Sequence, residues 1–170
     1  MPFLYQLAQH VQEMPSSVAL RESLWVYPII ESAHVLGLCL FVGTAWLWDL
    51  RLLGLTLRRV PVSQLSAQIL PWTVIGFAIM AVSGLGLVFS EPLRFYSNIF
   101  FRIKLALLAV AGVNAFVFHQ TVGRRKEEWD LDPRTPFRAR LAGALSLGTW
   151  AAVIVTGRLI AYNWFGAVRP

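Results

Sequence analysis

The stretch SLWVYPIIESAHVLGLCLFVGTAWLWDLRLL, residues 23–53, decides the fold. Its residues are mostly apolar, and an α-helix over its length would measure about 45 Å at about 1.5 Å per residue. The hydrocarbon core of a bilayer is about 30 Å thick, so this helix can cross it with length to spare for tilt or for an end among the headgroups. The sequence therefore predicts a first transmembrane span over residues 23–53.

Two ionisable side chains, Glu31 and His34, lie in the first half of this span. A charged group at such depth costs roughly a few kcal/mol, so intramembrane ionisable residues usually face a partner, a cavity or a ligand. The two residues are three apart and share one helix face, which Tyr27 and Leu38 extend. The pair is therefore either part of a functional site or a hydrogen-bonded lock between helices.

The composition is that of a membrane protein with one small helical domain. Of the 170 residues, 56% are hydrophobic and only 14% are charged, and the mean hydropathy is +0.59. The net charge of +6 would suit a nucleic-acid-binding protein, but the basic residues cluster in connecting segments and form no stripe on a polar domain. The composition therefore favours the lipid bilayer, and not nucleic acid, as the partner.

The rest of the chain predicts an all-α, four-helix integral membrane bundle. Three more apolar runs are long enough to span, so that residues 23–170 form the bundle; these runs are residues 65–90, 97–122 and 141–164. Residues 1–22 form an interfacial N-terminal segment, because residues 2–14 have apolar positions at helical spacing and are too few to span. Pro15 and the serines after it should break that helix, and residues 123–140 should form an exposed, charged loop.

The positive charges predict an orientation. The connections after the first and third spans carry most of the basic residues, whereas the few on the opposite side are roughly balanced by glutamates. By the positive-inside rule both basic connections are cytoplasmic, which makes the chain a multi-pass protein of the bacterial inner membrane with both termini periplasmic. No removable signal peptide is evident, so we expect the first span to direct its own insertion.

With this topology, polar residues from all four spans fall at a similar depth in the outer half of the membrane. They are Glu31 and His34 in the first span, Ser83 in the second, Arg102 and Lys104 in the third, and Arg158 and Tyr162 in the fourth. Because residues two apart point in different directions on a helix, only one of Arg102 and Lys104 can readily face the core. The other should extend toward the headgroups. The sequence thus predicts one polar site shared by four helices.

The chemistry of these residues suits a b-type haem. His34 would be the axial ligand of the iron, and Glu31, one turn away, would orient the imidazole or accept a proton. Arginine and lysine pair well with carboxylates, so the haem propionates would be neutralised by the three cations Arg102, Lys104 and Arg158. A quinone would need fewer cations, and a metal ion would need none.

The second ligand of such an iron stays open. His119 lies about 22 Å further along its helix than Lys104, so it cannot share one iron with His34. Either Lys104 is a weak sixth ligand, or His119 serves a different centre or is simply interfacial. Soft copper sites use clusters of Cys and Met, whereas Cys39 is off the face of His34 and the three methionines are scattered, which argues against a copper conduit.

Three segments carry a resemblance to known families. Residues 29–53, IIESAHVLGLCLFVGTAWLWDLRLL, resemble the first span of the haem-containing, oxygen-independent membrane protoporphyrinogen oxidase family, with His34 and Arg51 at the positions of its histidine and arginine. Residues 100–119, FFRIKLALLAVAGVNAFVFH, resemble that family's third span, with Lys104 as its lysine. They are also similar to the copper resistance protein D family, whose asparagine corresponds to Asn114.

The second span resembles both families through the stretch SGLGLV, which begins at Ser83. In the oxidase family the histidine and the lysine are tied to haem binding and activity, which implies this role for His34 and Lys104. The chain departs from the pattern at Glu31, at Arg102 and in a fourth span that ends GRLIAY. The resemblance therefore implies a distinct branch of the superfamily and no particular substrate.

The leading hypothesis is a membrane protein that binds one haem b and works in electron transfer or membrane oxidoreduction. It would act as an oxidoreductase itself or with a redox partner in a larger membrane complex, and a homo-oligomer is compatible with the sequence. The first alternative is a cofactor-free membrane subunit or small transporter held together by a Glu-His-Lys-Arg network. The second alternative is copper transport.

Overall fold

The computed structural model describes residues 2–130 and 135–162, and every regular element in these ranges is a helix. The elements in chain order are α1 (Pro2–Glu13), α2 (Pro15–Glu22), α3 (Val26–Leu52), α4 (Val62–Ser90), α5 (Pro92–Ser97), α6 (Ile99–Gln120), the 3-10 helix η1 (Gly123–Trp129) and α7 (Phe137–Leu159). Helices α3, α4, α6 and α7 are each long and apolar enough to cross a membrane. The prediction of an all-α, four-helix membrane bundle is confirmed, and the chain is a multi-pass membrane protein.

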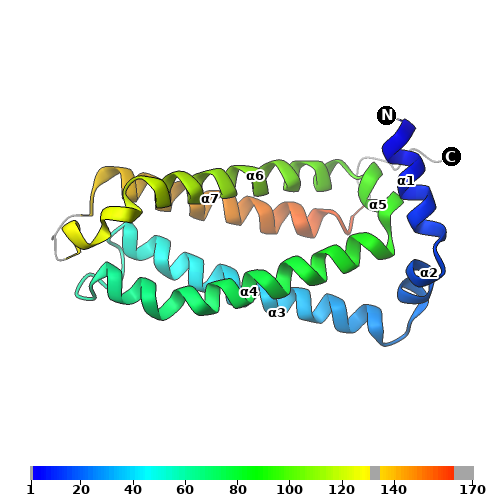
Figure 1. Cartoon of the computed structure of the whole chain (residues 1–170), viewed down its shortest axis with the longest axis horizontal. Coiled ribbons are helices and arrows are strands. Elements are labelled where there is room, and N and C mark those ends of the chain that lie inside the picture. Colours follow the sequence, from blue (N-terminus) through cyan, green and yellow to red (C-terminus); the bar gives the residue numbers. More distant parts are fainter. Residues whose placement is uncertain (1, 131–134, 163–170) are drawn as a thin grey trace.

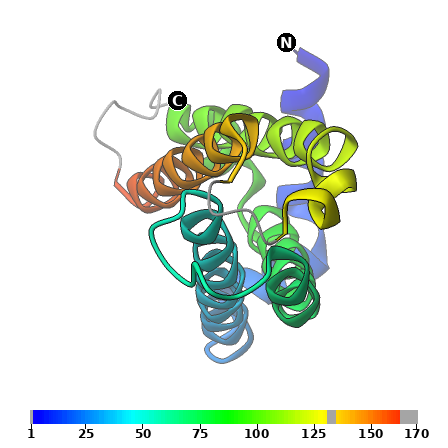
Figure 2. The same ribbon diagram turned by 90° about the vertical axis from the view of Figure 1, so that its left-hand side faces the viewer.

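The four spans run alternately up and down in two layers (Figure 1). Helices α3 and α4 form one antiparallel hairpin and α6 and α7 form the other, and α3 joins the layers by packing against α7. One end of the bundle, here called the α1 end, gathers α1, α2, the start of α3 and α6 and the end of α4 and α7. The opposite end, called the η1 end, carries η1 and the connection between α3 and α4, and it faces the viewer in Figure 2.

Reciprocal glycine contacts hold α3 and α4 together. A Cβ atom on Gly76 of α4 would lie 2.6 Å from the backbone nitrogen of Phe41 on α3, and one on Gly37 of α3 would lie 2.9 Å from the Cγ2 atom of Ile79. Only glycines allow two backbones to approach so closely. In the same crossing, the Thr73 hydroxyl donates a hydrogen bond to the Thr44 hydroxyl at 2.9 Å.

Two apolar cores lie along the bundle. The central core joins α3, α4, α6 and α7 through Phe41, Val42, Met80, Ala111, Trp150 and Val153. The second core lies at the η1 end and comprises Leu52, Val62, Phe118, Trp129 and Ala139. The ring of Phe41 meets that of Trp150 edge-on at 4.6 Å between centroids, a favoured aromatic geometry.

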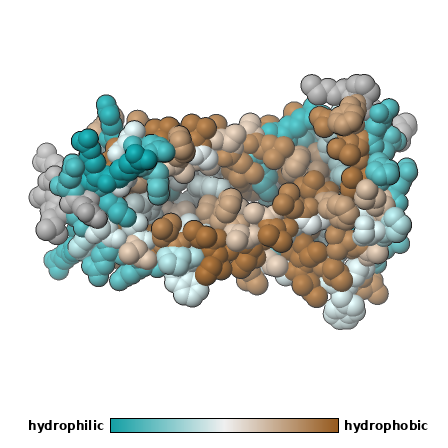
Figure 3. Space-filling model, in the orientation of Figure 1, coloured by the Kyte–Doolittle hydropathy of each residue, from teal (hydrophilic) through white to brown (hydrophobic). Residues whose placement is uncertain are grey.

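The outer surface is apolar along the spans and polar at the ends. Figure 3 shows hydrophobic side chains over the length of the spans and hydrophilic ones gathered at the η1 end. Only 6% of the most apolar window of α6 is buried within the chain, because α6 packs along α7 and barely touches α4. A surface of this kind is stable only against lipid or another membrane protein.

Several predicted boundaries are corrected. The break at Pro15 is real, but the chain resumes at once as α2, because proline is well tolerated in the first turn of a helix. Helix α7 begins at Phe137, so Arg138 and Arg140 belong to its first turn and not to the loop. Part of the predicted loop is the 3-10 helix η1, while residues 131–134 and the predicted end of the fourth span at 163–164 lie outside the described residues.

Polar contacts fix the α1 end. The Ser17 hydroxyl of α2 donates to the Phe89 carbonyl at 2.9 Å, and Arg21 donates to the Ser90 carbonyl at 3.2 Å, so α2 satisfies carbonyls at the end of α4. The Asn98 side chain accepts from the amides that open α6 and donates to the Ile160 carbonyl at 3.2 Å. The start of α6 is thereby tied to the end of α7.

Candidate functional site

His34 of α3 is oriented by Ser83 of α4. The two side chains are hydrogen-bonded at 3.0 Å between Nδ1 and Oγ. The Ser83 hydroxyl also lies 2.5 Å from the Ile79 carbonyl, to which it must donate because a carbonyl can only accept. The Ser83 oxygen therefore accepts from Nδ1–H of His34. In this tautomer the lone pair of Nε2 is free to bind a metal.

Gly84 of α4 leaves room for the imidazole ring of His34. A Cβ atom on Gly84 would lie 3.0 Å from Cε1 and 3.4 Å from Nδ1 of His34. Any larger residue at this position would have to push the ring away from α4. The SGLGLV stretch thus contributes both the acceptor for Nδ1–H and the space for the ring.

Lys104 reaches toward the same region from the other layer. Its ammonium would lie 3.5 Å from a Cβ atom on Gly157 of α7, and the side chain is half-buried. Its charge is close enough to act on His34. Within residues 2–130 and 135–162 we find no acceptor that hydrogen-bonds to Lys104 and no carboxylate paired with it. A cation is therefore placed near the histidine without a partner of opposite charge in the described chain.

The other two cations of the predicted site point outward. Arg102 is exposed, donates to the Tyr96 carbonyl at 3.2 Å and has its guanidinium 5.7 Å from the centre of the Tyr96 ring. The prediction that only one of Arg102 and Lys104 faces the core is therefore confirmed. Arg158 is also exposed, and it donates to the hydroxyl of Tyr162 at 3.2 Å while its guanidinium lies 5.4 Å from that ring. Arg102 and Lys104 lie in the first two turns of α6 and Arg158 in the last turn of α7, so all three cations belong to the half of the bundle at the α1 end.

Glu31 and His119 lie apart from this group. Glu31 is exposed, and no hydrogen bond joins it to His34, so Ser83 performs the orienting role that the sequence assigned to the glutamate. His119 is exposed in the last turn of α6, at the η1 end, with its ring against Phe118. His34 and His119 therefore lie at opposite ends of the bundle, as the sequence predicted.

The structure thus brings together His34, Ser83 and Lys104, here called the His34 site. Arg102, Arg158 and Tyr162 belong to the same end of the bundle but are exposed, and no described contact joins them to this site. Among the described residues, no three His, Cys, Asp or Glu side chains are grouped as they would be around a metal ion.

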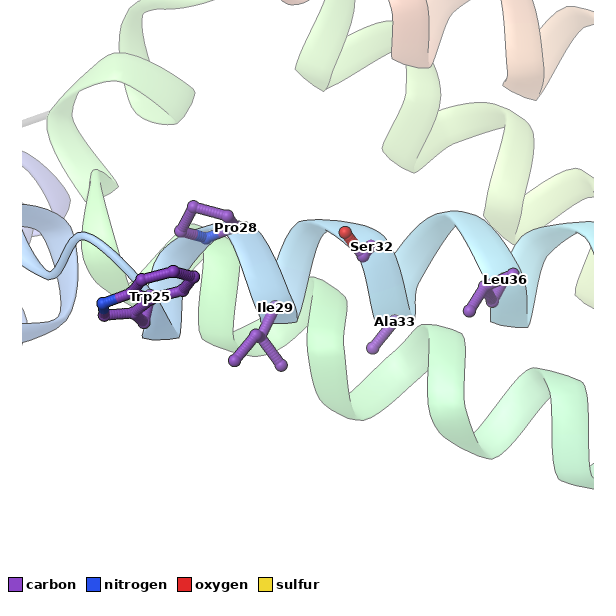
Figure 4. A pocket seen from close by; sticks show the side chains of 6 residues that line it. All are labelled: Trp25, Pro28, Ile29, Ser32, Ala33 and Leu36. Carbon is purple, nitrogen blue, oxygen red and sulfur yellow. The ribbon is translucent and has the colours of Figure 1, made fainter.

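A shallow groove of about 440 Å³ follows the outer face of α3 (Figure 4). It is lined by Trp25, Pro28, Ile29, Ser32, Ala33 and Leu36. At about 100° per residue these positions centre on the side of α3 opposite His34, so the groove faces away from the His34 site. Its lining is almost wholly apolar, which suits contact with lipid chains.

The sequence interpretation missed a second polar position on α3. Asp49 and Arg51 stand near the end of the first apolar run, where charged residues usually meet the headgroups, yet they are only 4% and 5% exposed. Asp49 follows Glu31 by 18 residues, about five helical turns, so the two lie on one helix face. This spacing is the feature of the sequence from which the position of Asp49 could have been predicted. Arg51 donates to the Val60 carbonyl at 3.0 Å and so closes the connection after α3.

One family is similar to most of the chain. The profile of a family of unknown function (DUF6644) matches residues 25–163. The chain belongs to the DUF6644 family. The range that matches DUF6644 contains all four spans and every residue of the His34 site, while α1 and α2 precede it. No curated protein and no solved structure has significant similarity to this DUF6644 chain.

Proposed function

We propose that this DUF6644 protein binds one b-type haem through Nε2 of His34 and serves in electron transfer or membrane oxidoreduction. The observation that carries the proposal is the hydrogen bond from Nδ1–H of His34 to Ser83. Histidines that bind metals usually donate their other ring N–H to an acceptor, which fixes the tautomer and makes the ligating nitrogen more basic. His34 has this arrangement within a membrane span.

The residues around His34 fit the remaining needs of a haem. Its two propionates require cations, and the first candidate is the ammonium of Lys104, which has no hydrogen-bonded or oppositely charged partner within residues 2–130 and 135–162. Arg102 and Arg158, whose present partners are neutral tyrosine groups, supply two more at the same end of the bundle. Gly84 and Gly157 remove side-chain bulk beside His34 and Lys104, which favours approach of a flat ligand. When bound, the haem would supply an iron that accepts and releases one electron at a time.

The orientation belongs to the same proposal. Arg58, Arg59, Arg124 and Arg125 are exposed at the η1 end. By the positive-inside rule this end is cytoplasmic, and the α1 end with the His34 site faces the periplasm of a bacterial inner membrane. A redox partner would then dock from the periplasmic side or within the membrane.

A cofactor-free membrane subunit is the second candidate, because the His34–Ser83 bond also joins α3 to α4. Interhelical hydrogen bonds of this type contribute about 1 kcal/mol to membrane bundles. In such a subunit, the bond would only hold α3 against α4, and Lys104, Gly84 and Gly157 would serve helix packing.

The two candidates are separated by visible spectroscopy on protein purified from haem-replete cells. Haem ligation predicts a Soret band that is lost in His34→Ala and kept in His119→Ala, the matched control at the opposite end. A cofactor-free subunit predicts no Soret band in the native protein or in either variant, and a lower melting temperature for His34→Ala. Copper that co-purifies and disappears in His34→Ala would support copper transport instead. A Soret band equally strong in His34→Ala would refute His34 as the ligand.

A further inference from the structure

Two buried polar atoms on α3, far from the His34 site, have no hydrogen-bond partner among the residues that the structure describes. They are the carboxylate oxygen Oδ2 of Asp49 and the indole nitrogen Nε1 of Trp46. Asp49 as a whole is only 4% exposed. Because it follows His34 by 15 residues, it lies about 22 Å further along the helix and is not part of that site.

Helices α3 and α7 flank these two atoms. Asp49 packs against α7, where a Cβ atom on Gly143 would lie 3.1 Å from its carbonyl oxygen and where the Ser146 hydroxyl interacts with its carboxyl group. Trp46 packs against the central core, which includes Trp150 of α7. The region therefore lies where α3 packs against α7.

The chemistry of the pair selects its ligand. Residues three apart lie on one face of a helix, so the indole N–H and the carboxylate oxygen face a common region. One is a donor and the other an acceptor, and buried polar groups are costly without hydrogen bonds. A bare metal cation would be disfavoured by the indole N–H. A water molecule satisfies both, since it accepts from Nε1–H and donates to Oδ2, with the Ser146 hydroxyl available as a third partner.

We propose that Asp49 and Trp46 hold a water molecule between α3 and α7, at a binding site independent of the His34 site. Asp49 is three residues from the end of α3 at Leu52, which is about 4.5 Å along the helix axis. The bound water therefore lies close to the η1 end.

Infrared spectroscopy of the purified full-length protein in D2O and in D2¹⁸O tests the site. An O–D stretch that shifts on ¹⁸O substitution belongs to water and not to a protein group. We expect such a band in the native protein and in Trp48→Phe, a neighbouring control, and we expect its loss in Trp46→Phe and Asp49→Asn. Trp46→Phe removes only the indole donor and preserves an aromatic ring, so it keeps the test decisive if Asp49→Asn does not fold.

Thermal unfolding of the double variant gives a second readout. Because either substitution alone breaks the same water bridge, the melting-temperature losses of Trp46→Phe and Asp49→Asn should combine to less than their sum. The losses of Trp48→Phe and Asp49→Asn should be additive. The proposal is overturned if the ¹⁸O-sensitive band is absent from the native protein or unchanged in Trp46→Phe.

Discussion

At the scale of single residues, one serine decides what His34 can do. The Ser83 hydroxyl donates to its own helix and accepts from Nδ1–H, which leaves Nε2 as the reactive nitrogen. The sequence could show that His34 and Ser83 lie at one depth, because depth follows from position along each span. It could not show which residue meets the imidazole, because this depends on the rotation of α4 about its axis, which the Gly37 and Gly76 contacts set.

Ser83→Ala should weaken haem retention while leaving the ligand in place. The substitution removes the acceptor for Nδ1–H, and losing such a partner typically lowers metal affinity by about 10- to 100-fold. Haem titration of the apoprotein measures the effect. Ser97→Ala, which removes an exposed hydroxyl bonded within its own chain segment, is the control. Unchanged affinity in Ser83→Ala would show that Ser83 does not prepare the ligand.

Lys104→Met should move stability and haem retention in opposite directions. An unpaired ammonium within a span is costly, so its replacement by an apolar chain of similar length should raise the melting temperature of the apoprotein. The same change removes a propionate partner and should weaken haem binding. Arg102→Met, at an exposed position, should leave the melting temperature nearly unchanged. A destabilised Lys104→Met apoprotein would indicate a structural role for the lysine.

At the scale of elements, glycines set the distance between helices and a loop anchors one of their ends. The η1 segment leads into Asp130, which accepts a hydrogen bond from the Ser63 amide at 2.7 Å and another from the Ser63 hydroxyl. Asp130 thereby caps the start of α4, where the N-cap residue Pro61 has no side-chain bond to offer. The sequence predicted an exposed loop at residues 123–140 because charged residues outnumber apolar ones there. Burial of the single residue Trp129 in the core at the η1 end holds η1 in place, and composition does not reveal it.

Gly76→Ala should separate α3 from α4. The new Cβ atom would lie 2.6 Å from the Phe41 backbone nitrogen, and a backbone cannot move aside as a flexible side chain can. Overpacking of this type typically costs about 1–3 kcal/mol. Gly43→Ala is the matched control, because its Cβ atom meets nothing within 4 Å. Denaturation in detergent compares the two, and an equally stable Gly76→Ala would contradict the close crossing.

The cap at Asp130 should make stability depend on pH. Burial alone would raise the pKa of the Asp130 carboxyl, but the hydrogen bonds from Ser63 and Val62 and the charge of Arg51 outweigh it and lower the pKa from its ordinary value of 3.8. A carboxyl whose pKa falls on folding stabilises the protein above its unfolded-state pKa, and this contribution is lost as the pH drops through the folded-state pKa.

Melting temperatures measured from neutral to acidic pH test this contribution. The native protein should lose more stability than Asp130→Asn as the pH falls below about 4, because the variant has already lost the charge. Glu128→Gln, at an exposed position of η1, should follow the native curve. If the native protein and Asp130→Asn lose the same melting temperature on acidification, the Asp130 carboxylate does not stabilise the start of α4.

At the scale of the whole molecule, the hydropathy pattern is sufficient to predict the fold but not the arrangement of side chains at the candidate site. Four spans follow from the length of the apolar runs, whereas side-chain direction depends on how the two hairpins pack. Glu31 illustrates the difference: its face was predicted to point into the bundle, but it is exposed at the end where α3 begins. Asp49, five turns along that same face, is the residue that α7 covers.

The orientation predicts which residues a membrane-impermeant thiol reagent can reach. In a Cys39→Ser background, which leaves no other cysteine, Arg125→Cys should be labelled only after the inner membrane is opened. Gln6→Cys, exposed on α1, should be labelled in intact spheroplasts. The reverse pattern would place the His34 site on the cytoplasmic side.

The visible spectrum of the native protein, purified from haem-replete cells, tests the central claim most directly. We predict a Soret band with close to one haem per chain that disappears in His34→Ala and persists in His119→Ala. A folded native protein without a Soret band, which also fails to acquire one on titration with haem, would contradict the claim that His34 is a haem ligand.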